Sequence, residues 1–157
     1  MSSRGIRLAF VSMLVIGICL LGVVLSGKYS LMLNKTNSLP GSVFLIERGV
    51  LPGRGELVFF QPPPSSFIHM RMLKEIGGVA GDVVEMRDRV FSVNGQLIGR
   101  AKETSVTGRP LLPGPVGTIE PGYLFVVGSS QDSYDSRYAE IGWVSLSQVI
   151  GRGHRLF

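Results

Sequence analysis

A run of 19 residues without a charged side chain, Leu8–Ser26, constrains this chain more than any other feature. The run reads LAFVSMLVIGICLLGVVLS, with Arg4 and Arg7 before it and Lys28 after it. As a helix it would span roughly 28 Å, which is close to the thickness of a bilayer hydrocarbon core. Because basic residues stay on the cytoplasmic side, the two arginines predict that the chain from Lys28 onward lies outside.

A cleavable signal peptide is the alternative, because the small residues Ser26 and Gly27 follow the run. Secretory apolar regions are usually about 7–15 residues long, however, and no clear Ala-x-Ala site follows this one. We therefore expect an uncleaved cytoplasmic stub and transmembrane anchor over residues 1–27. The remaining residues, 28–157, have the length of one further domain. Both alternatives place that domain across the membrane.

Beyond the apolar run the composition favours a mainly β domain. The chain has 21 Gly and 9 Pro, and no stretch after Lys28 has a helical period. Asn94-Gly95 predicts a tight hairpin turn, whereas residues 61–67 and 100–122 predict irregular segments. Short apolar runs punctuated by turn residues predict strands at 43–47, 57–60, 68–76, 83–86, 90–93, 96–98, 124–127, 143–146 and 148–150.

Charge and ligand-type residues exclude several classes of function. The net charge is +5 without a Lys/Arg-rich run, so we expect no nucleic-acid partner. Cys19 is the only cysteine and lies in the apolar run, so it forms no internal disulfide and offers no external thiol. His69 and His154 lack the spacing of a metal site. We therefore expect neither a metal nor a cofactor.

A serine and a lysine outside the apolar run could form a catalytic pair. A serine hydroxyl needs a base, and a lysine serves as that base only where its surroundings lower its pKa. Ser38 lies soon after the run, and alternation around Lys74 predicts that Met70 and Met72 share its strand face. Taken singly, each residue also fits an ordinary role, a turn serine or a solvated strand lysine.

The sequence resembles type I signal peptidases, the Ser/Lys peptidases of family S26. Ser38-Leu39-Pro40 resembles their nucleophile box, Ser-Met-x-Pro or Ser-Met-Pro. Residues 74–82 resemble their Lys-Arg-x-x-Gly-x-Pro-Gly-Asp box, and residues 128–138 resemble their C-terminal box, which ends in Ser-x-Asp-Ser-Arg. The resemblance covers residues 8 to 152 and implies a signal-peptidase-like β-barrel or sheet catalytic domain behind one transmembrane helix.

Local context favours one branch of that family. Residues 34–41, the compact size and the short spacing from Ser38 to Lys74 look more like the conjugative-transfer peptidases that mature pilin subunits. Leu39 replaces the usual Met, which conserves volume. Other departures from the family pattern leave every catalytic group in place: Glu75 for Arg, Ala80 for Pro, and Ser129-Ser130 for Asp-Asn.

The resemblance implies a role for each site residue. Ser38 would attack the scissile carbonyl, and neutral Lys74 would accept its proton and later return a proton to the leaving amine. The Ser38 backbone N–H would be one oxyanion donor, and the Thr36 hydroxyl would be the second. Thr36 could equally be an ordinary turn threonine.

The C-terminal motif implies orienting groups. Asp135 would be a third catalytic residue that orients the site, paired with Arg137. Alternatively, the two residues form a buried ion pair that holds the last strands. Ser136 would hydrogen-bond near Lys74 and help to position it.

The implied partners are an exported preprotein or pilin with small residues before the scissile bond, and membrane lipid. Phe59, Phe60, Phe67 and the three prolines at 62–64 could touch lipid or could belong to the core and a loop. The implied location is the outer face of a bacterial inner membrane. The sequence does not indicate an oligomeric state.

Three other functions stay open on the sequence. The first is a housekeeping signal peptidase. The second is a repressor-type Ser/Lys autoprotease, which would need a DNA-binding domain where this chain has its apolar run. The third is a non-catalytic anchored β domain of a secretion or transfer apparatus.

Overall fold

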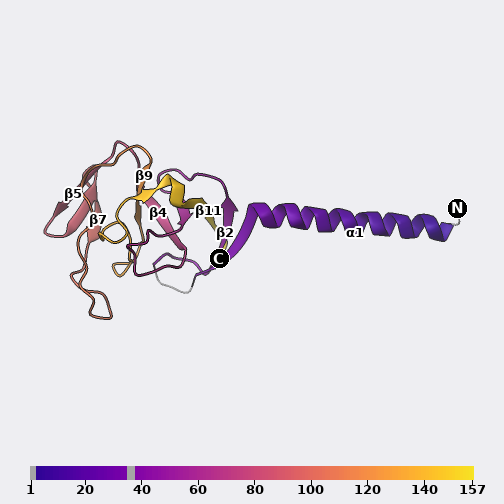
Figure 1. Cartoon of the computed structure of the whole chain (residues 1–157), viewed down its shortest axis with the longest axis horizontal. Helices are drawn as coiled ribbons and strands as arrows, with labels where there is room; N and C mark the ends of the chain where they lie inside the picture. The colour runs from indigo at the N-terminus through magenta and orange to yellow at the C-terminus, as the bar shows by residue number, and fades with distance from the viewer. Residues whose placement is uncertain (1–2, 35–37) are drawn as a thin grey trace.

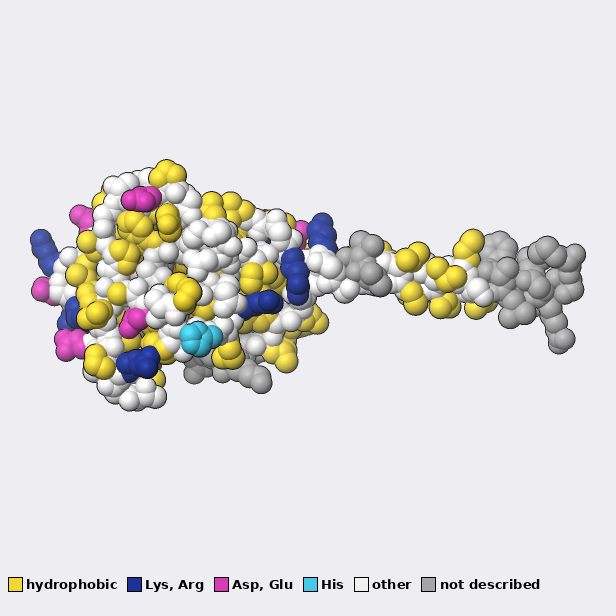
Figure 2. Space-filling view, viewed as in Figure 1, with side chains coloured by type: hydrophobic (Ala, Val, Ile, Leu, Met, Phe, Trp, Pro, Cys, Tyr) yellow, Lys and Arg dark blue, Asp and Glu magenta, His cyan; other side chains and the backbone are white. Residues whose placement is uncertain are grey.

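A long helix leads into a body of β-strands (Figure 1). The computed structural model describes residues 3–34 and 38–157. The helix, α1, covers Ser3–Lys28, and its segment Val11–Lys28 is long and apolar enough to cross a membrane. None of that segment is buried in the protein, and exposed apolar side chains are visible along its described part (Figure 2). This is the single N-terminal apolar helix that the sequence predicts.

The strands form two antiparallel sheets. In spatial order, the larger sheet consists of β1 (Tyr29–Leu33), β2 (Val43–Arg48), β11 (Val149–Arg155), β3 (Leu57–Phe60), β4 (Met72–Gly78), β9 (Tyr123–Val127) and β10 (Val144–Ser145). The smaller sheet consists of β7 (Gln96–Arg100), β6 (Val90–Val93), β5 (Val83–Arg87) and β8 (Gly117–Thr118). A 3-10 turn at Leu146–Gln148 joins β10 to β11.

The mainly β fold is confirmed, with differences at particular strands. Asn94 and Gly95 have φ of 49° and 77°, as the predicted hairpin turn requires. The strand predicted over 68–76 begins only at Met72. Strand β1 was not predicted, because it is an edge strand with little burial contrast. Strand β8 has only two residues and lies within the segment 100–122, which was predicted to be irregular with room for one short strand.

Both sheets bury apolar side chains around the strands that carry the site. The core of the larger sheet includes Val58, Phe60 and Val126, each with no exposed surface. Phe59 is 9% exposed, so Phe59 and Phe60 belong to the core rather than to a lipid-contacting surface. Phe67 remains 37% exposed. The core fixes β4 between β3 and β9.

A polar turn fixes the far end of β4. The Asp82 carboxylate accepts the Val79 N–H at 2.7 Å and the Asn94 amide at 2.8 Å, and pairs with Arg54 at 2.6 Å. The hydrogen bond from Arg54 is the main reason that the pKa of Asp82 falls to about 2. Gly81 has φ of 90°, a conformation that favours glycine. The Gly81-Asp82 pair thus anchors the connection between the two sheets.

Candidate active site

Lys74 lies in the middle of β4 and is only 3% exposed. Its cross-strand partner is the fully buried Val58, and Met72 on the same strand is 9% exposed. Burial lowers the pKa of Lys74 to about 8, although nearby Asp135 favours the charged form. The predicted contribution of Met70 is wrong, because Met70 precedes the strand and is 78% exposed.

The hydrogen-bond partner of Lys74 is Ser133. The Lys74 Nζ donates to Ser133 Oγ at 2.8 Å, and both side chains are buried. Ser136, which was predicted to hydrogen-bond near Lys74, accepts the Val126 N–H at 2.9 Å, whereas the Lys74 ammonium donates to Ser133. Ser133 is the first serine of the Ser-x-Asp-Ser-Arg sequence, and that position was the signal that could have identified it.

Ser38 lies in the segment between β1 and β2 and is half-buried. Its carbonyl accepts two hydrogen bonds from Ser129, at 3.0 Å from the N–H and 3.3 Å from Oγ. The next residue, Leu39, is 6% exposed and packs in the core, which anchors the segment. Thr36, the predicted second oxyanion donor, lies outside the described residues.

Gly128 brings the serine and lysine segments together. A Cβ at this glycine would lie 2.1 Å from Ser133 Oγ and 2.7 Å from the Ser38 carbonyl oxygen. Both approaches are closer than a side chain allows, so only glycine fits between Ser38 and the hydroxyl that contacts Lys74. Residues 38, 74 and 133, which are far apart in sequence, therefore meet at one place.

Asp135 and Arg137 form a buried, two-point ion pair. Both bonds, from Arg137 Nε and Nη2 to the two carboxylate oxygens, measure 2.9 Å, and neither side chain is more than 3% exposed. Asp135 also accepts the Gly128 N–H at 3.0 Å. Arg137 donates to the carbonyls of Arg100 and Ser133 at 3.2 Å and 3.1 Å. The pair therefore holds the segment that carries Ser133 and Gly128.

Glu75, which departs from the family pattern, does not disturb the site. It is exposed, while its neighbours on both sides along β4 are buried. Within residues 3–34 and 38–157, no cluster of three or more His, Cys, Asp or Glu residues could hold a metal ion. The arrangement thus offers a shielded lysine of lowered pKa that is hydrogen-bonded to Ser133, with the Ser38 backbone next to Ser133 across Gly128. A lysine of lowered pKa is the kind of base that a serine nucleophile needs.

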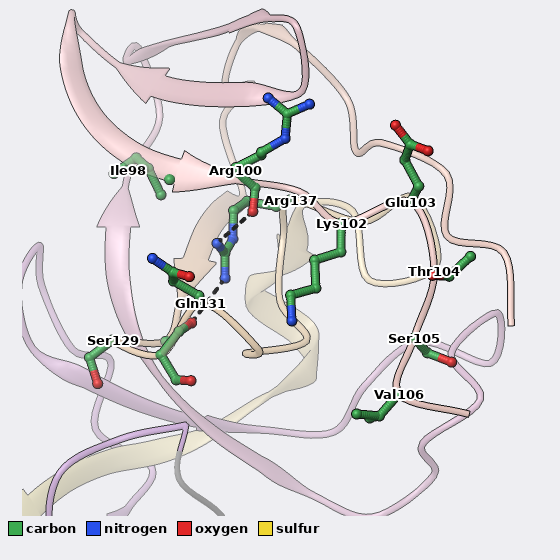
Figure 3. A pocket seen from close by; sticks show the side chains of 13 residues that line it. Ile98, Arg100, Lys102, Glu103, Thr104, Ser105, Val106, Ser129, Gln131 and Arg137 are labelled. Atoms are coloured by element: carbon green, nitrogen blue, oxygen red, sulfur yellow. Dashed lines mark hydrogen bonds between the residues drawn. The ribbon is translucent and has the colours of Figure 1, made fainter. Parts of the chain in front are cut away.

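A cavity of about 730 Å³ adjoins this arrangement (Figure 3). One wall is formed by residues 102–106, which follow β7, and the opposite wall by residues 128–131. The second wall includes Gly128 and Ser129, the two residues that approach the Ser38 carbonyl. The cavity therefore begins next to the candidate nucleophile.

Comparison with known proteins matches the chain to relatives across most of its length. It is 30% identical to a conjugal transfer protein TraF of Agrobacterium fabrum (strain C58 / ATCC 33970), over 87% of this chain and 90% of that protein. It is 31% identical to a probable signal peptidase I-2 of Synechocystis sp. (strain ATCC 27184 / PCC 6803 / Kazusa), over 64% of this chain and 46% of that protein.

Among solved structures, a signal peptidase I from Enterococcus faecalis V583 matches with a TM-score of 0.43 and 24% identity. The match covers 65% of this chain and 96% of that one. The family model described as signal peptidase, peptidase S26, matches residues 4–157. Because that match spans nearly the whole sequence, the chain belongs to the peptidase S26 signal peptidase family.

Proposed function

We propose that this protein is a membrane-anchored serine endopeptidase with Ser38 as nucleophile and Lys74 as general base. The observation that carries the proposal is the environment of Lys74, which is buried, hydrogen-bonded to Ser133 and lowered in pKa to about 8. At pH 7 roughly one tenth of such a lysine is neutral, about 300-fold more than at a pKa of 10.5.

The proposed reaction follows from that protonation state. Ser38 Oγ attacks the scissile carbonyl while its proton passes to the neutral Lys74 Nζ, and the lysine then protonates the leaving amine. Water next attacks the acyl-enzyme, and Lys74 accepts a proton again. The hydrogen bond to Ser133 restricts where Nζ can lie through these steps. In this proposal Asp135 and Arg137 orient the segment that carries Ser133 and do not themselves transfer protons.

The apolar helix supports a membrane location for this reaction. We propose that α1 spans a bacterial inner membrane with Arg4 and Arg7 inside, which places the peptidase domain, residues 28–157, on the outer side. Ser38 follows Lys28 by only ten residues, so the nucleophile would work near the membrane surface. Cleavage sites just beyond the membrane segment of an exported protein would be within its reach.

We further propose that the substrate is a pilin subunit of a conjugation system, which the protein would cleave during pilin maturation. The similarity to the conjugal transfer proteins covers 86–87% of this chain, at 29–30% identity, whereas the match to the probable signal peptidase I-2 covers 64%. The longer coverage by the conjugal transfer proteins supports a pilin-type substrate over general preprotein processing. A preprotein with small residues before the scissile bond is the alternative substrate.

Single alanine substitutions test the proposal. The full chain in detergent micelles would be mixed with a pilin precursor from a conjugation system, and cleavage would be followed by mass spectrometry. Ser38→Ala and Lys74→Ala should each abolish cleavage, whereas Ser42→Ala, at an exposed serine four residues away, should not. The cleavage rate of the unmodified protein should rise with pH through about 8, as Lys74 loses its proton.

Two results would contradict the proposal. Cleavage that persists in both variants would remove Ser38 and Lys74 from the reaction. A protein that binds the precursor and never cleaves it would instead be a non-catalytic module of the transfer apparatus.

A further inference from the structure

Hydrogen bonds within the chain hold one wall of the cavity beside Ser38 in place. The hairpin over residues 102–110 makes one wall, and its two arms are bridged at Thr104 and Pro110. Arg89 donates to the carbonyls of Ala101 and Leu111 at 3.0 Å and 2.8 Å, where the hairpin begins and ends. These contacts within the chain fix the base of the hairpin.

Glycines leave room where the cavity meets buried Arg137. A Cβ at Gly99 would lie 3.1 Å from the Arg137 guanidinium, and a Cβ at Gly128 would collide with the Ser133 hydroxyl. Both glycines line the cavity. Backbone that carries no side chain allows close approach by another backbone, as in the binding of an extended peptide.

One charged side chain points into the space between the two walls. Figure 3 shows the Lys102 ammonium between the hairpin and the 128–131 wall, whereas the Glu103 carboxylate points away. Arg137 is also cationic, but its charge is balanced by Asp135. Arg100 also lines the cavity, but Figure 3 shows its guanidinium pointing away from the 128–131 wall. Lys102 is therefore the cation that a ligand between the two walls would meet.

The present partner of Lys102 is readily replaced. Lys102 pairs with Asp132, and both side chains are well exposed, at 47% and 65%. An exposed ion pair contributes little net stability, about 0–1 kcal/mol. A carboxylate from a ligand could therefore take the place of Asp132 at small cost, and the ligand would then bridge the hairpin and the Ser129–Gln131 segment.

We propose that this cavity binds a segment of the peptide substrate that carries an acidic side chain or a terminal carboxylate, with Lys102 as its specificity-determining residue. The inference rests on the proposed endopeptidase function, because the wall that contacts Ser38 is also a wall of the cavity. A peptide whose carbonyl reaches Ser38 would extend along that wall, and Lys102 would select its charge.

A binding experiment separates this inference from catalysis. The full chain carrying Ser38→Ala, in detergent micelles, would be titrated with dye-labelled Ala- and Gly-rich peptides identical except for one Glu, Gln or Lys. Anisotropy should show the Glu peptide binding about three- to tenfold tighter than the Gln peptide. The preference should fall as NaCl rises from about 0.05 M to about 0.5 M.

Two variants distinguish a ligand site from a structural ion pair. Lys102→Met should abolish the preference for Glu, whereas Asp132→Asn should increase it, because the competing carboxylate is gone. A purely structural pair predicts that both variants behave alike, since each breaks the same contact. Arg87→Gln, at an exposed cation outside the cavity lining, should leave the preference unchanged.

The inference is overturned by equal binding of the Glu and Gln peptides, by a preference that survives Lys102→Met, or by loss of preference in Asp132→Asn. Failure of the proposed function gives a different pattern. In that case the chain with Ser38 intact binds the Glu peptide with the same preference but cleaves no precursor.

Discussion

Replacing Lys74 by methionine should inactivate the protein and make it more stable at neutral pH. Methionine keeps an unbranched side chain and removes an ammonium group from a position that is only 3% exposed. The neighbours Val58 and Met72 are apolar and buried, so they accept a thioether without loss of packing. Where a residue serves catalysis at the expense of stability, its replacement is expected to lower activity and raise the free energy of unfolding.

The size of the effect follows from the pKa of Lys74. A fall in pKa from 10.5 to about 8 corresponds to about 3 kcal/mol of destabilisation at pH 7. Loss of the hydrogen bond leaves the buried Ser133 hydroxyl without its lysine partner, which costs about 1 kcal/mol. The free energy of unfolding of Lys74→Met should therefore exceed that of the unmodified protein by about 2 kcal/mol at pH 7.

The advantage of the variant should depend on pH. The folded protein loses the Lys74 proton near pH 8, whereas the unfolded chain keeps it to about 10.5. The unmodified protein therefore gains stability as the pH rises between these values, because the unfolded state then binds more protons. The variant lacks this group, so its advantage is full below about pH 8 and gone near pH 10.5.

Denaturant unfolding of the full chain in mild detergent, followed by the fluorescence of the single tryptophan, Trp143, measures the difference. Unfolding would be compared at pH 7 and pH 10, with Arg87→Met as a control at an exposed cation. The reasoning is refuted if Lys74→Met is less stable at pH 7, or if its advantage is the same at both pH values.

Two further substitutions test the supports of the site. Gly128→Ala should remove cleavage activity, because its Cβ would lie 2.1 Å from Ser133 Oγ, whereas Gly53→Ala, with 3.8 Å of space, should remain active; equal activities in the cleavage assay would contradict this. Asp135→Asn should lower the free energy of unfolding by about 3–5 kcal/mol, because Arg137 is left buried without its partner charge. A loss below about 1 kcal/mol in denaturant unfolding would show that the pair is not a structural support.

Local sequence signals predicted the elements that depend on local chemistry. The strand at 57–60 agrees with β3, and the Asn94-Gly95 turn has the predicted positive φ values, because both depend on neighbouring residues. The strand around Lys74 was placed too early. Alternation of apolar residues continues through Met70, but pairing with β3 includes only residues from Met72 onward.

The environment of the lysine could not be read from its own strand. Met70 has the correct spacing, yet it is exposed, whereas Ser133 lies 59 residues away and forms the hydrogen bond. Ser136 was predicted from the sequence, and Ser133 became apparent only once the chain after β9 was placed in space. Hydrogen bonding depends on which hydroxyl the turn directs to Nζ, and that direction is a tertiary property.

The sequence by itself determined the N-terminal apolar segment, and its resemblance to S26 peptidases identified Ser38 and Lys74 as the candidate pair. Composition and motif order are linear properties of the chain. Only the tertiary structure decided how the pair is surrounded. It placed Gly128 against both Ser38 and Ser133 and buried Lys74 in the core. It also formed the cavity that Lys102 lines and that begins next to the Ser38 backbone. Burial and contact between distant residues arise when strands pair, so no local pattern specifies them.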